Sequence, residues 1–415
     1  MKIAVIGGGS TYTPELVKGI LEISREITID EIDLYDINEE KQNIVYDFLL
    51  RYVKGRLNLK KRTSVEDAVS DADYVVFQFR PGGLKGRELD EKIPLKYGLV
   101  GQETTGMGGF SAALRAFPVI EKYVEAVKKY SNAFIVNFTN PSGHITEFVL
   151  NYLGYERFVG LCNIPVNLKR HVAEVFSCDT EDVGLKYYGL NHLSFVEKIF
   201  VKGTDVTRQF LEKIKEQLSA SLEGEFPAWL LDVLGVVPNP YLRYYLMEET
   251  MLKKLRSQKL RSQEVMEIEQ RLLEIYRKAS DIPEELSKRG GSMYSTAAAL
   301  LIRDLELGKG TVHVLNTKNN GSILNLPPDY VLEIPCYVRK KLVAPICQGE
   351  ADTFALPFVH AVKIYERLTI EAYLKRSKKM ALKAILAHPL GPGVEKAREL
   401  LEEILKANEE FVKLE

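Results

Sequence analysis

The chain has 415 residues, and its 56 basic and 57 acidic side chains leave a formal net charge of −1. This balance argues against a nucleic-acid-binding or membrane-surface protein that relies on bulk charge, and four cysteines are too few for a disulfide framework. No apolar run approaches the roughly eighteen residues of a membrane span, and the N-terminal apolar run lacks a signal-peptide cleavage site. We therefore expect a soluble protein of the reducing cytoplasm, with two domains or one large one.

The first 140 residues alternate short apolar runs with helical patterns. The predicted strands cover residues 2–6, 31–35, 73–79 and 133–138, and the predicted helices cover 14–25, with Thr13 as N-cap, and 39–54. Strands that alternate with helices indicate a parallel, doubly wound sheet. Nearly continuous apolar strands also fit a sheet that is covered on both faces.

The pattern changes after about residue 165. Strands are predicted at 184–190, 195–201, 311–316, 330–336 and 341–346, and helices at 207–222, 241–255, 262–279 and 292–305, with three more from about residue 357. No linker separates the two parts. We predict an α/β chain with an N-terminal Rossmann-like, dinucleotide-binding domain over 1–165. A tightly packed α+β domain over 166–415 would hold the substrate and metal site and the oligomer contacts.

A glycine-rich turn follows the first predicted strand. Gly7 and Gly9 fill the first two glycine positions of the dinucleotide fingerprint, and Ser10 and Thr11 follow them toward the first helix. Tyr12 stands where a third glycine is usual. Asp36 ends the second strand, where a carboxylate can bind ribose hydroxyls and repel a 2′-phosphate, so the motif favours NAD over NADP. The alternative is a glycine turn that binds nothing, with Asp36 only capping a helix.

Cys162 and His192 each stand at the end of a predicted strand, in the segments GLCNIP and YYGLNH. Ligands of α/β folds bind at such ends, and a thiolate with an imidazole could hold a metal. The pair taken alone is more typical of a buried cysteine and a core histidine. Two ligands also fall short of the three usual in a catalytic zinc site, so substrate or water oxygens would have to complete the shell.

Other polar positions are open to two interpretations. Asn140 could hold sugar hydroxyls or a phosphate, or could merely cap the helix after an Asn-Pro turn. Glu103 lies in a polar stretch bounded by glycines, and Arg87 follows the glycine-containing loop 80–83. Tyr241 is one of 21 tyrosines, most of which should be structural, and Arg261 between two predicted helices would ordinarily be a solvated side chain.

Taken together, these segments resemble glycoside hydrolase family 4 over nearly the whole chain. The segments that carry the resemblance are IAVIGGGSTYTPEL, RPGGLKGRELDEKIPLKYGLVGQETTGMGGF, NFTNPSG, GLCNIP, GLNHLSF and PNPY. The resemblance implies hydrolysis by an oxidoreductive route with NAD⁺ and a divalent metal, usually Mn²⁺, in place of two carboxylates. A thiolate–imidazole pair alone would favour Zn²⁺, but sugar oxygens would supply the harder ligands that Mn²⁺ prefers.

The resemblance also implies a role at each matching position. Cys162 and His192 would bind the metal, and Tyr241 would remove the proton from sugar C2. Glu103 would raise the basicity of Tyr241. The substrate would be held by Asn140, Asn163, Arg87 and Arg261, with the two arginines near its 6-phosphate.

Asn163 also bears on the anomer that is cleaved. Members of the family that act on 6-phospho-α-glucosides tend to have Asp at this position, after the metal-binding cysteine, whereas Asn163 resembles the 6-phospho-β-glucosidases. An amide cannot donate a proton as an acid would, so the general acid is open. We expect a phosphorylated disaccharide or aryl glucoside as substrate, such as cellobiose 6-phosphate, and a homodimer or homotetramer that binds neither nucleic acid nor membrane.

The implied reaction passes hydride from C3 to NAD⁺, removes the C2 proton, expels the aglycone, adds water at C1 and returns the hydride. Two other classes are weighed against it. An NAD-dependent 2-hydroxy acid dehydrogenase would accumulate NADH and would not need Cys162. A non-catalytic NAD-binding regulator would bind the nucleotide without turnover. The ordered set of motifs argues against both classes.

Overall fold

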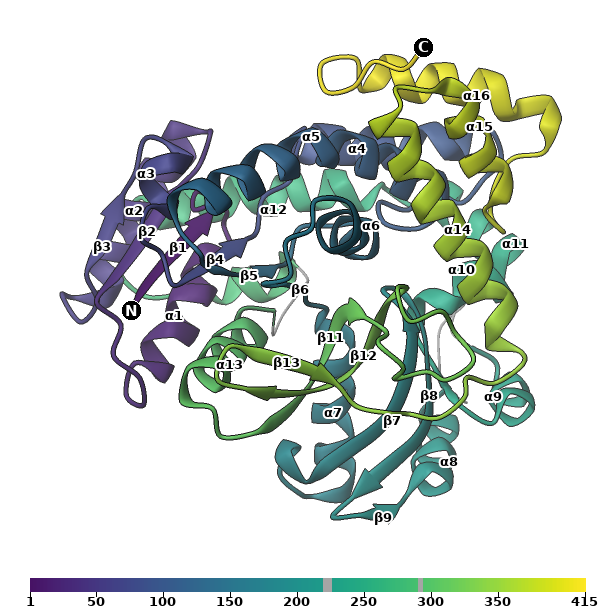
Figure 1. The fold of residues 1–415 in the computed structure, drawn as a ribbon, viewed down its shortest axis with the longest axis horizontal. Helices are drawn as coiled ribbons and strands as arrows, with labels where there is room; N and C mark the ends of the chain where they lie inside the picture. Colours follow the sequence, from purple (N-terminus) through teal and green to yellow (C-terminus); the bar gives the residue numbers. More distant parts are fainter. Residues whose placement is uncertain (219–225, 290–293) are drawn as a thin grey trace.

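The structure, a computed structural model, describes residues 1–218, 226–289 and 294–415 (Figure 1). Its larger sheet has nine strands in the order β13-β12-β11-β6-β5-β4-β1-β2-β3. These strands are β1 (Lys2–Ile6), β2 (Glu31–Tyr35), β3 (Leu59–Lys61), β4 (Tyr74–Phe77), β5 (Phe134–Asn137), β6 (Phe158–Gly160), β11 (Thr311–Lys318), β12 (Val331–Arg339) and β13 (Leu342–Pro345). The six strands β1 to β6 are parallel, and β11 to β13 extend the β6 edge in antiparallel pairing.

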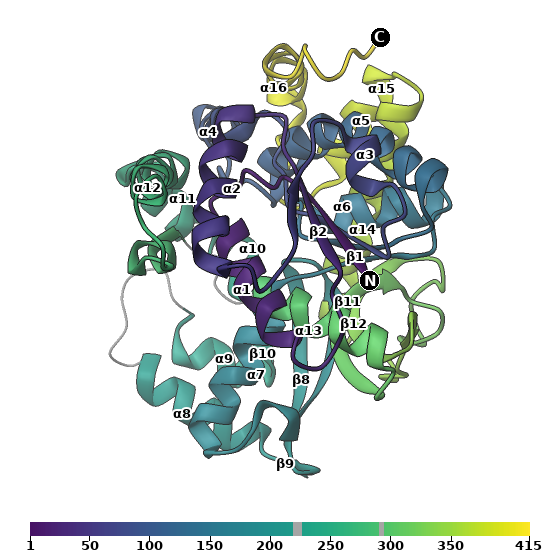
Figure 2. The same cartoon turned by 90° about the vertical axis from the view of Figure 1, so that its left-hand side faces the viewer.

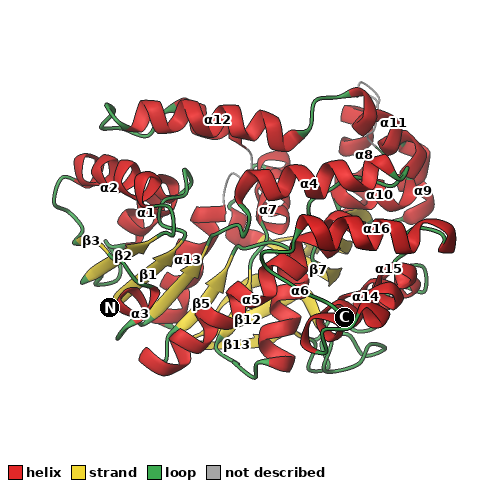
Figure 3. Cartoon of the chain, turned by 90° about the horizontal axis from the view of Figure 1, so that it is seen from above, coloured by secondary structure: helices red, strands yellow, loops and turns green. Residues whose placement is uncertain are grey.

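Successive residues of the parallel strands face opposite sides of this sheet. Ile3 and Val5 of β1 pack in one apolar cluster with helices α1 (Thr13–Ile23) and α2 (Glu39–Val53), while Ala4 and Ile6 pack in another with α3 (Val65–Val69) and α5 (Gly106–Tyr130). Both faces of the sheet are therefore covered, which explains why its strands are apolar throughout. Figure 3 shows the strands with helices on either side, and the predicted α/β, doubly wound fold is confirmed.

The helices of the first half connect these parallel strands. They are α1 (Thr13–Ile23), α2 (Glu39–Val53), α3 (Val65–Val69), α4 (Gly83–Lys96), α5 (Gly106–Tyr130), α6 (Ser142–Glu147) and the π-helical turn η1 (Phe148–Tyr152). Because parallel strands begin and end together, the turns that follow β1, β2, β4, β5 and β6 all open at one edge of the sheet.

The second half adds a small antiparallel sheet and a layer of helices. The small sheet holds β7 (Val183–Leu190), β8 (Leu193–Val201), β9 (Thr204–Asp205) and β10 (Val237–Pro238). Its helices are α7 (Asn163–Phe176), α8 (Thr207–Leu218), α9 (Ala228–Leu234), α10 (Arg243–Leu246), α11 (Glu248–Ser257), α12 (Arg261–Tyr276), α13 (Tyr294–Leu307), α14 (Ala355–Leu374), α15 (Lys378–Ala387) and α16 (Val394–Ala407), with short turns η2 (Thr180–Asp182), η3 (Pro240–Leu242) and η4 (Glu284–Arg289).

The second half does not stand apart from the first. Helix α12 contacts both α2 and α4 and lies outside them (Figures 2 and 3), and β11 continues the sheet at β6. The division of the chain into 1–165 and 166–415 stays a prediction, since strands from both segments form the larger sheet. None of the helices in the described ranges is long and apolar enough to cross a membrane.

Three local predictions need correction or qualification. Thr13 is the first residue of α1 rather than its cap, and Tyr12 occupies the cap position without a capping side-chain bond. The helix predicted over 241–255 is interrupted, because the backbone of Met247 (φ −134°, ψ 39°) leaves the helical region between α10 and α11. The predicted end of helix 207–222 and start of helix 292–305 lie outside the described residues.

Candidate active site

A cavity of about 1100 Å³ lies at the carboxyl edge of the parallel strands, where the second half of the chain closes over it. Its walls include the glycine turn after β1, the loops after β4 and β5, the stretch 101–103, and parts of α12. Predicted site residues that line it are Gly7, Gly9, Ser10, Asp36, Arg87, Glu103, Asn140, Asn163, His192, Tyr241 and Arg261. The fold thus brings residues more than 200 positions apart into one cavity.

The glycine turn leaves no room for side chains. Gly7 has φ +93°, and a Cβ there would lie 2.8 Å from the carbonyl oxygen of Gln78. A Cβ on Gly9 would lie 3.0 Å from the carboxylate of Asp36. The glycines of this turn therefore present a bare backbone, without side chains, to the cavity. Such a backbone lets a pyrophosphate approach the N–H groups at a helix N-terminus.

Asp36 follows β2 and braces this turn. Its carboxylate accepts hydrogen bonds from the backbone N–H of Gly9 (3.0 Å) and of Asn38 (2.8 Å), while burial raises its pKa. Asp36 therefore does part of the capping that the alternative interpretation proposed, yet it also lines the cavity. Thr11, which the sequence groups with the nucleotide-binding residues, has a fully buried side chain and is not part of the cavity wall.

Cationic side chains from both halves of the chain lie near the glycine turn. The guanidinium of Arg289 lies 4.3 Å from the ring centroid of Tyr12 and pairs with Glu269 at 3.3 Å. Glu269 also pairs with Lys41 of α2. This arrangement places positive charge beside the helix N-terminus, where an anionic ligand would be stabilised.

His192 and Tyr241 form the centre of the opposite wall. Their rings stack with centroids 3.9 Å apart and planes 8° apart. Burial lowers the pKa of His192 to about 4, and only the charge of Glu103 opposes this shift, so the imidazole is neutral at ordinary pH. His192 stands in the two-residue turn between β7 and β8 with φ +63°. His192 therefore follows a strand, as predicted, and this strand belongs to the small sheet.

Cys162 is not part of the cavity wall, but its charge acts on Tyr241, which is. Cys162 follows β6 and is the N-cap residue of the 14-residue helix α7, with 1% of its surface exposed. The positive end of the helix dipole favours an anion at this position. The charge of Cys162 also contributes to raising the pKa of Tyr241, so the sulfur acts electrostatically on the ring that stacks on His192.

Tyr241 is held by its backbone as well as by its ring. The side chain of Asn239 accepts a hydrogen bond from the N–H of Tyr241 (2.9 Å) and donates to the hydroxyl of Ser194 in β8 (2.8 Å). Burial, and after it the charge of Glu103, raise the pKa of Tyr241, while the charge of Arg87 lowers it. A phenol in this place stays neutral unless further positive charge comes close to it.

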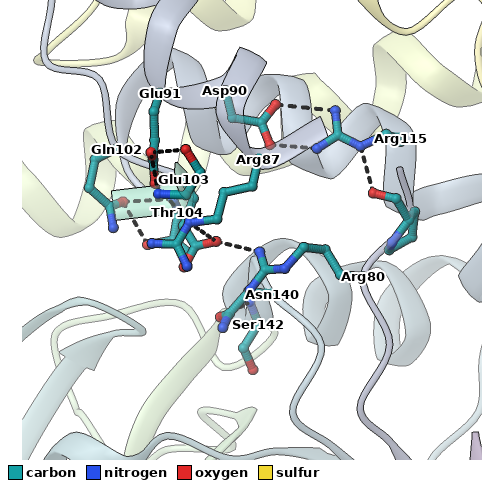
Figure 4. Close-up of polar contacts among 12 residues, drawn as sticks. Arg80, Arg87, Asp90, Glu91, Gln102, Glu103, Thr104, Arg115, Asn140 and Ser142 are labelled. Atoms are coloured by element: carbon teal, nitrogen blue, oxygen red, sulfur yellow. Dashed lines mark hydrogen bonds and ion pairs between the residues drawn. The ribbon is translucent and has the colours of Figure 1, made fainter. Parts of the chain in front are cut away.

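Glu103 lies between two arginines (Figure 4). It pairs with Arg80 and, at 3.2 Å, with the Nε of Arg87. Burial alone would raise its pKa, but the charges of Arg80 and Arg87 outweigh burial and keep its pKa below the ordinary value. Glu103 is therefore an ionised neighbour of Tyr241 whose charge is partly neutralised.

Glu91 connects the segments that carry Arg87 and Arg261, the two arginines that the resemblance assigns to the phosphate. It accepts a hydrogen bond from the Nε of Arg87 (2.7 Å) and from the backbone N–H (2.9 Å) and hydroxyl (2.6 Å) of Ser262. Ser262 follows Arg261 at the start of α12, so the contact pins Arg261 to the wall that carries Arg87. The guanidinium of Arg261 donates to the carbonyls of Lys288 and Arg289, both at 3.1 Å.

The two asparagines lie at strand ends, as predicted. Asn140 follows β5, and its side-chain oxygen accepts a weak hydrogen bond from the N–H of Ser142 (3.3 Å). Asn163 is the first residue of α7, directly after Cys162, and both asparagines line the cavity.

The sequence did not point to several residues in and around this cavity. Arg80, Thr104 and Arg289 contact the selected residues Glu103, His192 and Arg261, and Gln102 contacts Thr104. The polar stretch 101–106 was a usable signal for Gln102 and Thr104. No local sequence pattern pointed to Arg289 as a site residue, because its partners Tyr12 and Glu269 are distant in the sequence.

The residues present fit a dinucleotide and a metal. The bare glycine turn matches a pyrophosphate. A thiol and a neutral imidazole are both metal-ligand types, and His192 makes its hydrogen bond to Thr104 through Nδ1 and not through Nε2. No group of three or more His, Cys, Asp or Glu side chains suited to a metal occurs in the described ranges, so other oxygens would have to complete a shell begun by Cys162 and His192.

A dinucleotide-type sheet whose carboxyl edge opens onto a buried imidazole and phenol is typical of an α/β enzyme. Family models identify the family to which it belongs. The model for family 4 glycosyl hydrolases matches residues 2–178, and that for their C-terminal domain matches residues 187–391. The chain belongs to the family 4 glycosyl hydrolases.

Individual relatives are similar over their whole length. A 6-phospho-beta-glucosidase of Thermotoga maritima is 67% identical over 414 residues, with 100% of both chains covered, and a probable 6-phospho-beta-glucosidase of Bacillus subtilis is 36% identical, with 99% of this chain and 97% of that protein covered. A solved structure of the Thermotoga maritima 6-phospho-beta glucosidase with manganese, NAD⁺ and glucose-6-phosphate has a TM-score of 0.98, 66% identity and full coverage of both chains.

Proposed function

We propose that this chain is a 6-phospho-β-glucosidase that requires NAD and Mn²⁺ or another divalent metal. It would hydrolyse 6-phospho-β-glucosides, such as cellobiose 6-phosphate, to glucose 6-phosphate. One observation carries the proposal: the bare glycine turn and the stacked His192–Tyr241 pair share one cavity. The similarity to the Thermotoga maritima enzyme supports it.

The glycine turn and its neighbours would hold the nucleotide. Gly7, Gly9 and Ser10 would receive the pyrophosphate at the N-terminus of α1, and Asp36 would accept ribose hydroxyls with the lone pairs that the backbone does not use. Bound NAD⁺ would take hydride from C3 of the sugar and later return it, so the cofactor is unchanged after each turnover.

Tyr241 would act as the base at C2. Its raised pKa means that the phenol loses its proton only when positive charge approaches. A metal held by Cys162 and His192 would supply that charge and would polarise the sugar oxygens. Glu103 would make the phenolate more basic, and Arg87 would limit that effect. The ring stack with His192 keeps the phenol next to the metal site.

The phosphate would bind beside Arg87 and Arg261. Arg261 already uses part of its guanidinium on main-chain carbonyls, which fixes its orientation in advance of the substrate. Asn140 would hold sugar hydroxyls through its amide.

Asn163 would favour the β-anomer because its amide offers no acidic proton to an α-linked leaving group. Departure of the aglycone would then rely on water or on the leaving group's own stability. The side chain of Asn163 would contribute hydrogen bonds to the substrate.

We also place the protein in the cytoplasm and expect it to form a homodimer or homotetramer. Cys162 must stay reduced so that it can bind metal as a thiolate, which suits a reducing compartment. None of the four cysteines, all within the described ranges, forms a disulfide. Closed symmetry makes a dimer or a dimer of dimers the simplest assembly.

An activity matrix tests the proposal. The purified enzyme is assayed on aryl 6-phospho-α- and 6-phospho-β-glucosides, with and without NAD⁺, Mn²⁺ and a chelator. We expect turnover of the β-substrate only, and only with both cofactors. Turnover without NAD⁺, equal turnover of the α-substrate, or steady accumulation of NADH would overturn the proposal.

A further inference from the structure

A short chain of hydrogen bonds connects the stretch 101–106 to His192. The hydroxyl of Thr104 lies 2.7 Å from Nδ1 of His192 and 2.8 Å from Oε1 of Gln102. Oε1 of Gln102 also accepts a hydrogen bond from the backbone N–H of Thr104 at 2.6 Å. The pair Gln102–Thr104 appears together in Figure 4.

The direction of each bond follows from what each group can donate. A backbone N–H can only donate, so the Gln102 atom that it meets must be the oxygen and not the amide nitrogen. That oxygen can only accept, so the Thr104 hydroxyl must give its single proton to Gln102. Toward His192 the hydroxyl then offers lone pairs alone. Nδ1 of His192 must therefore be the protonated nitrogen and the donor.

We infer that Thr104 and Gln102 are positioning residues that hold His192 in its Nδ1–H tautomer and leave the lone pair of Nε2 for the metal. This inference rests on the proposed function for the metal role of His192. Histidine ligands usually donate their second N–H to an outer acceptor, and the acceptor fixes both tautomer and ring orientation. Here the acceptor is an oriented threonine hydroxyl, and the amide of Gln102 orients it.

The surroundings make this constraint strong. Gln102 is 9% exposed and His192 is 5% exposed, so water competes poorly for these bonds. The ring of Tyr241 covers one face of the imidazole, and the turn that carries His192 adopts a left-handed backbone. A flip of the ring about Cβ–Cγ would place the carbon Cδ2, which cannot form this hydrogen bond, at the Thr104 hydroxyl.

The first test reads the tautomer in the full-length enzyme with NAD⁺ and without added metal. Nitrogen-15 spectra of histidine-labelled protein distinguish Nδ1–H from Nε2–H, and a His192→Gln variant identifies the His192 signal among the six histidines. We expect Nδ1–H in the native enzyme. An Nε2–H pattern in the native enzyme overturns the inference, whatever the variants do.

The second test measures Mn²⁺ affinity by the electron paramagnetic resonance of unbound Mn²⁺. Thr104→Val keeps the branched shape but loses the acceptor, and we expect its affinity to fall about 10- to 100-fold. Thr104→Ser restores the hydroxyl and should bind Mn²⁺ nearly as the native enzyme does. NAD affinity of both variants serves as the control for folding.

The outcomes separate this inference from the proposed function. If His192→Gln loses Mn²⁺ while Thr104→Val retains native affinity, the metal site stands and the positioning role falls. If His192→Gln binds Mn²⁺ normally, the metal assignment itself falls. Equal losses in Thr104→Val and Thr104→Ser would also overturn the role of the hydroxyl.

Discussion

The imidazole of His192 and the phenol of Tyr241 lie face to face, with their ring centroids 3.9 Å apart. They come from different elements, the β7–β8 turn and the turn η3. A ligand that binds the edge of one ring therefore lies beside the edge of the other. This contact allows one metal ion both to be held by the imidazole and to lower the pKa of the phenol.

Loss of either proposed metal ligand should abolish turnover and spare the nucleotide site. We expect Cys162→Ser and His192→Ala to bind Mn²⁺ at least about 100-fold more weakly, because a shell with only two protein ligands cannot lose one. NAD affinity and the melting temperature should change little, since neither side chain touches the glycine turn. Mn²⁺ titration and NAD fluorescence titration check both parts, and full activity of either variant in metal-free buffer would contradict the assignment.

Arg261 should matter only when the substrate carries its phosphate. A charge-assisted hydrogen bond contributes about 1.5–3 kcal/mol, so Arg261→Ala should lower kcat/KM for a 6-phospho-β-glucoside by roughly 10- to 150-fold. Hydrolysis of the unphosphorylated glucoside, already much slower, should not change further. Arg277→Ala is a matched control, because Arg277 follows α12 on an exposed surface and pairs with Glu40. Similar losses for both substrates would place Arg261 away from the phosphate.

Tyr241→Phe should stop both hydrolysis and exchange at C2. If Tyr241 takes the C2 proton, turnover in D₂O places deuterium at C2 of the glucose 6-phosphate product. Phenylalanine preserves the stack on His192 but has no oxygen to accept the proton. Mass spectrometry of the product measures exchange.

A substrate deuterated at C2 covers the case in which the abstracted proton is shielded from solvent and returned. Loss of deuterium from the product, or a primary isotope effect on the rate, would then reveal the abstraction. Retention of the label with no isotope effect, together with activity in the absence of NAD⁺, would exclude this route.

Loss of one partner of the ion pair between Arg115 and Asp90 should lower the free energy of unfolding strongly, whereas replacement of both partners by apolar residues should lower it much less. Both side chains are nearly fully buried, and Arg115 also donates to the carbonyl of Pro81 and to the side chain of Asn408. Arg115→Met leaves the Asp90 carboxylate buried without its cation and should cost about 3–5 kcal/mol of unfolding free energy. The double variant Arg115→Met, Asp90→Leu should recover much of that loss. Chemical denaturation measures both, and an equally unstable double variant would show that packing, not charge, is at stake.

Asp304 should make the free energy of unfolding depend on pH in the acidic range. Burial would raise its pKa, but hydrogen bonds from His313, Arg303 and Thr311 lower it to about 2. Because the folded-state pKa lies below the ordinary value of about 3.9, the stabilisation is complete above that value and is lost as the pH falls toward 2. Asp304→Asn should be less stable than the native enzyme at pH 6, and the difference should shrink below about pH 4. A difference that stays constant from pH 6 to pH 3 would contradict this account.

Local sequence patterns were sufficient for much of the fold. Gly7, Gly9 and Asp36 lie where the first strand, turn and helix predicted them, because the bond between Gly9 and Asp36 spans only 27 positions. The strand predicted before His192 is present as β7, but the sequence did not indicate that it joins a separate small sheet. The residues of a strand do not by themselves specify which other strands it pairs with.

The contacts around the candidate site were harder to predict for the same reason. Thr104 meets His192 across 88 positions, and Glu91 meets Ser262 across 171. Such pairs form because the sheet edge and α12 are brought together by the core, and not because of any local motif. The resemblance to a family named residues for these places, but it gave no partner for Thr104 or Arg289.

The junction between β6 and β11 has a consequence for any attempt to divide the chain. A fragment that ended at residue 178 would keep the parallel strands but lose β11, which pairs with β6 and whose Asn316 side chain donates to the carbonyl of Gly160. The backbone of Phe158–Gly160 would then form an unpaired strand edge. The apolar surface that the second half normally covers would be exposed next to it. Such an edge is a template for pairing with other copies. The first half of the chain thus depends on the second half to cover this strand edge and to stay soluble.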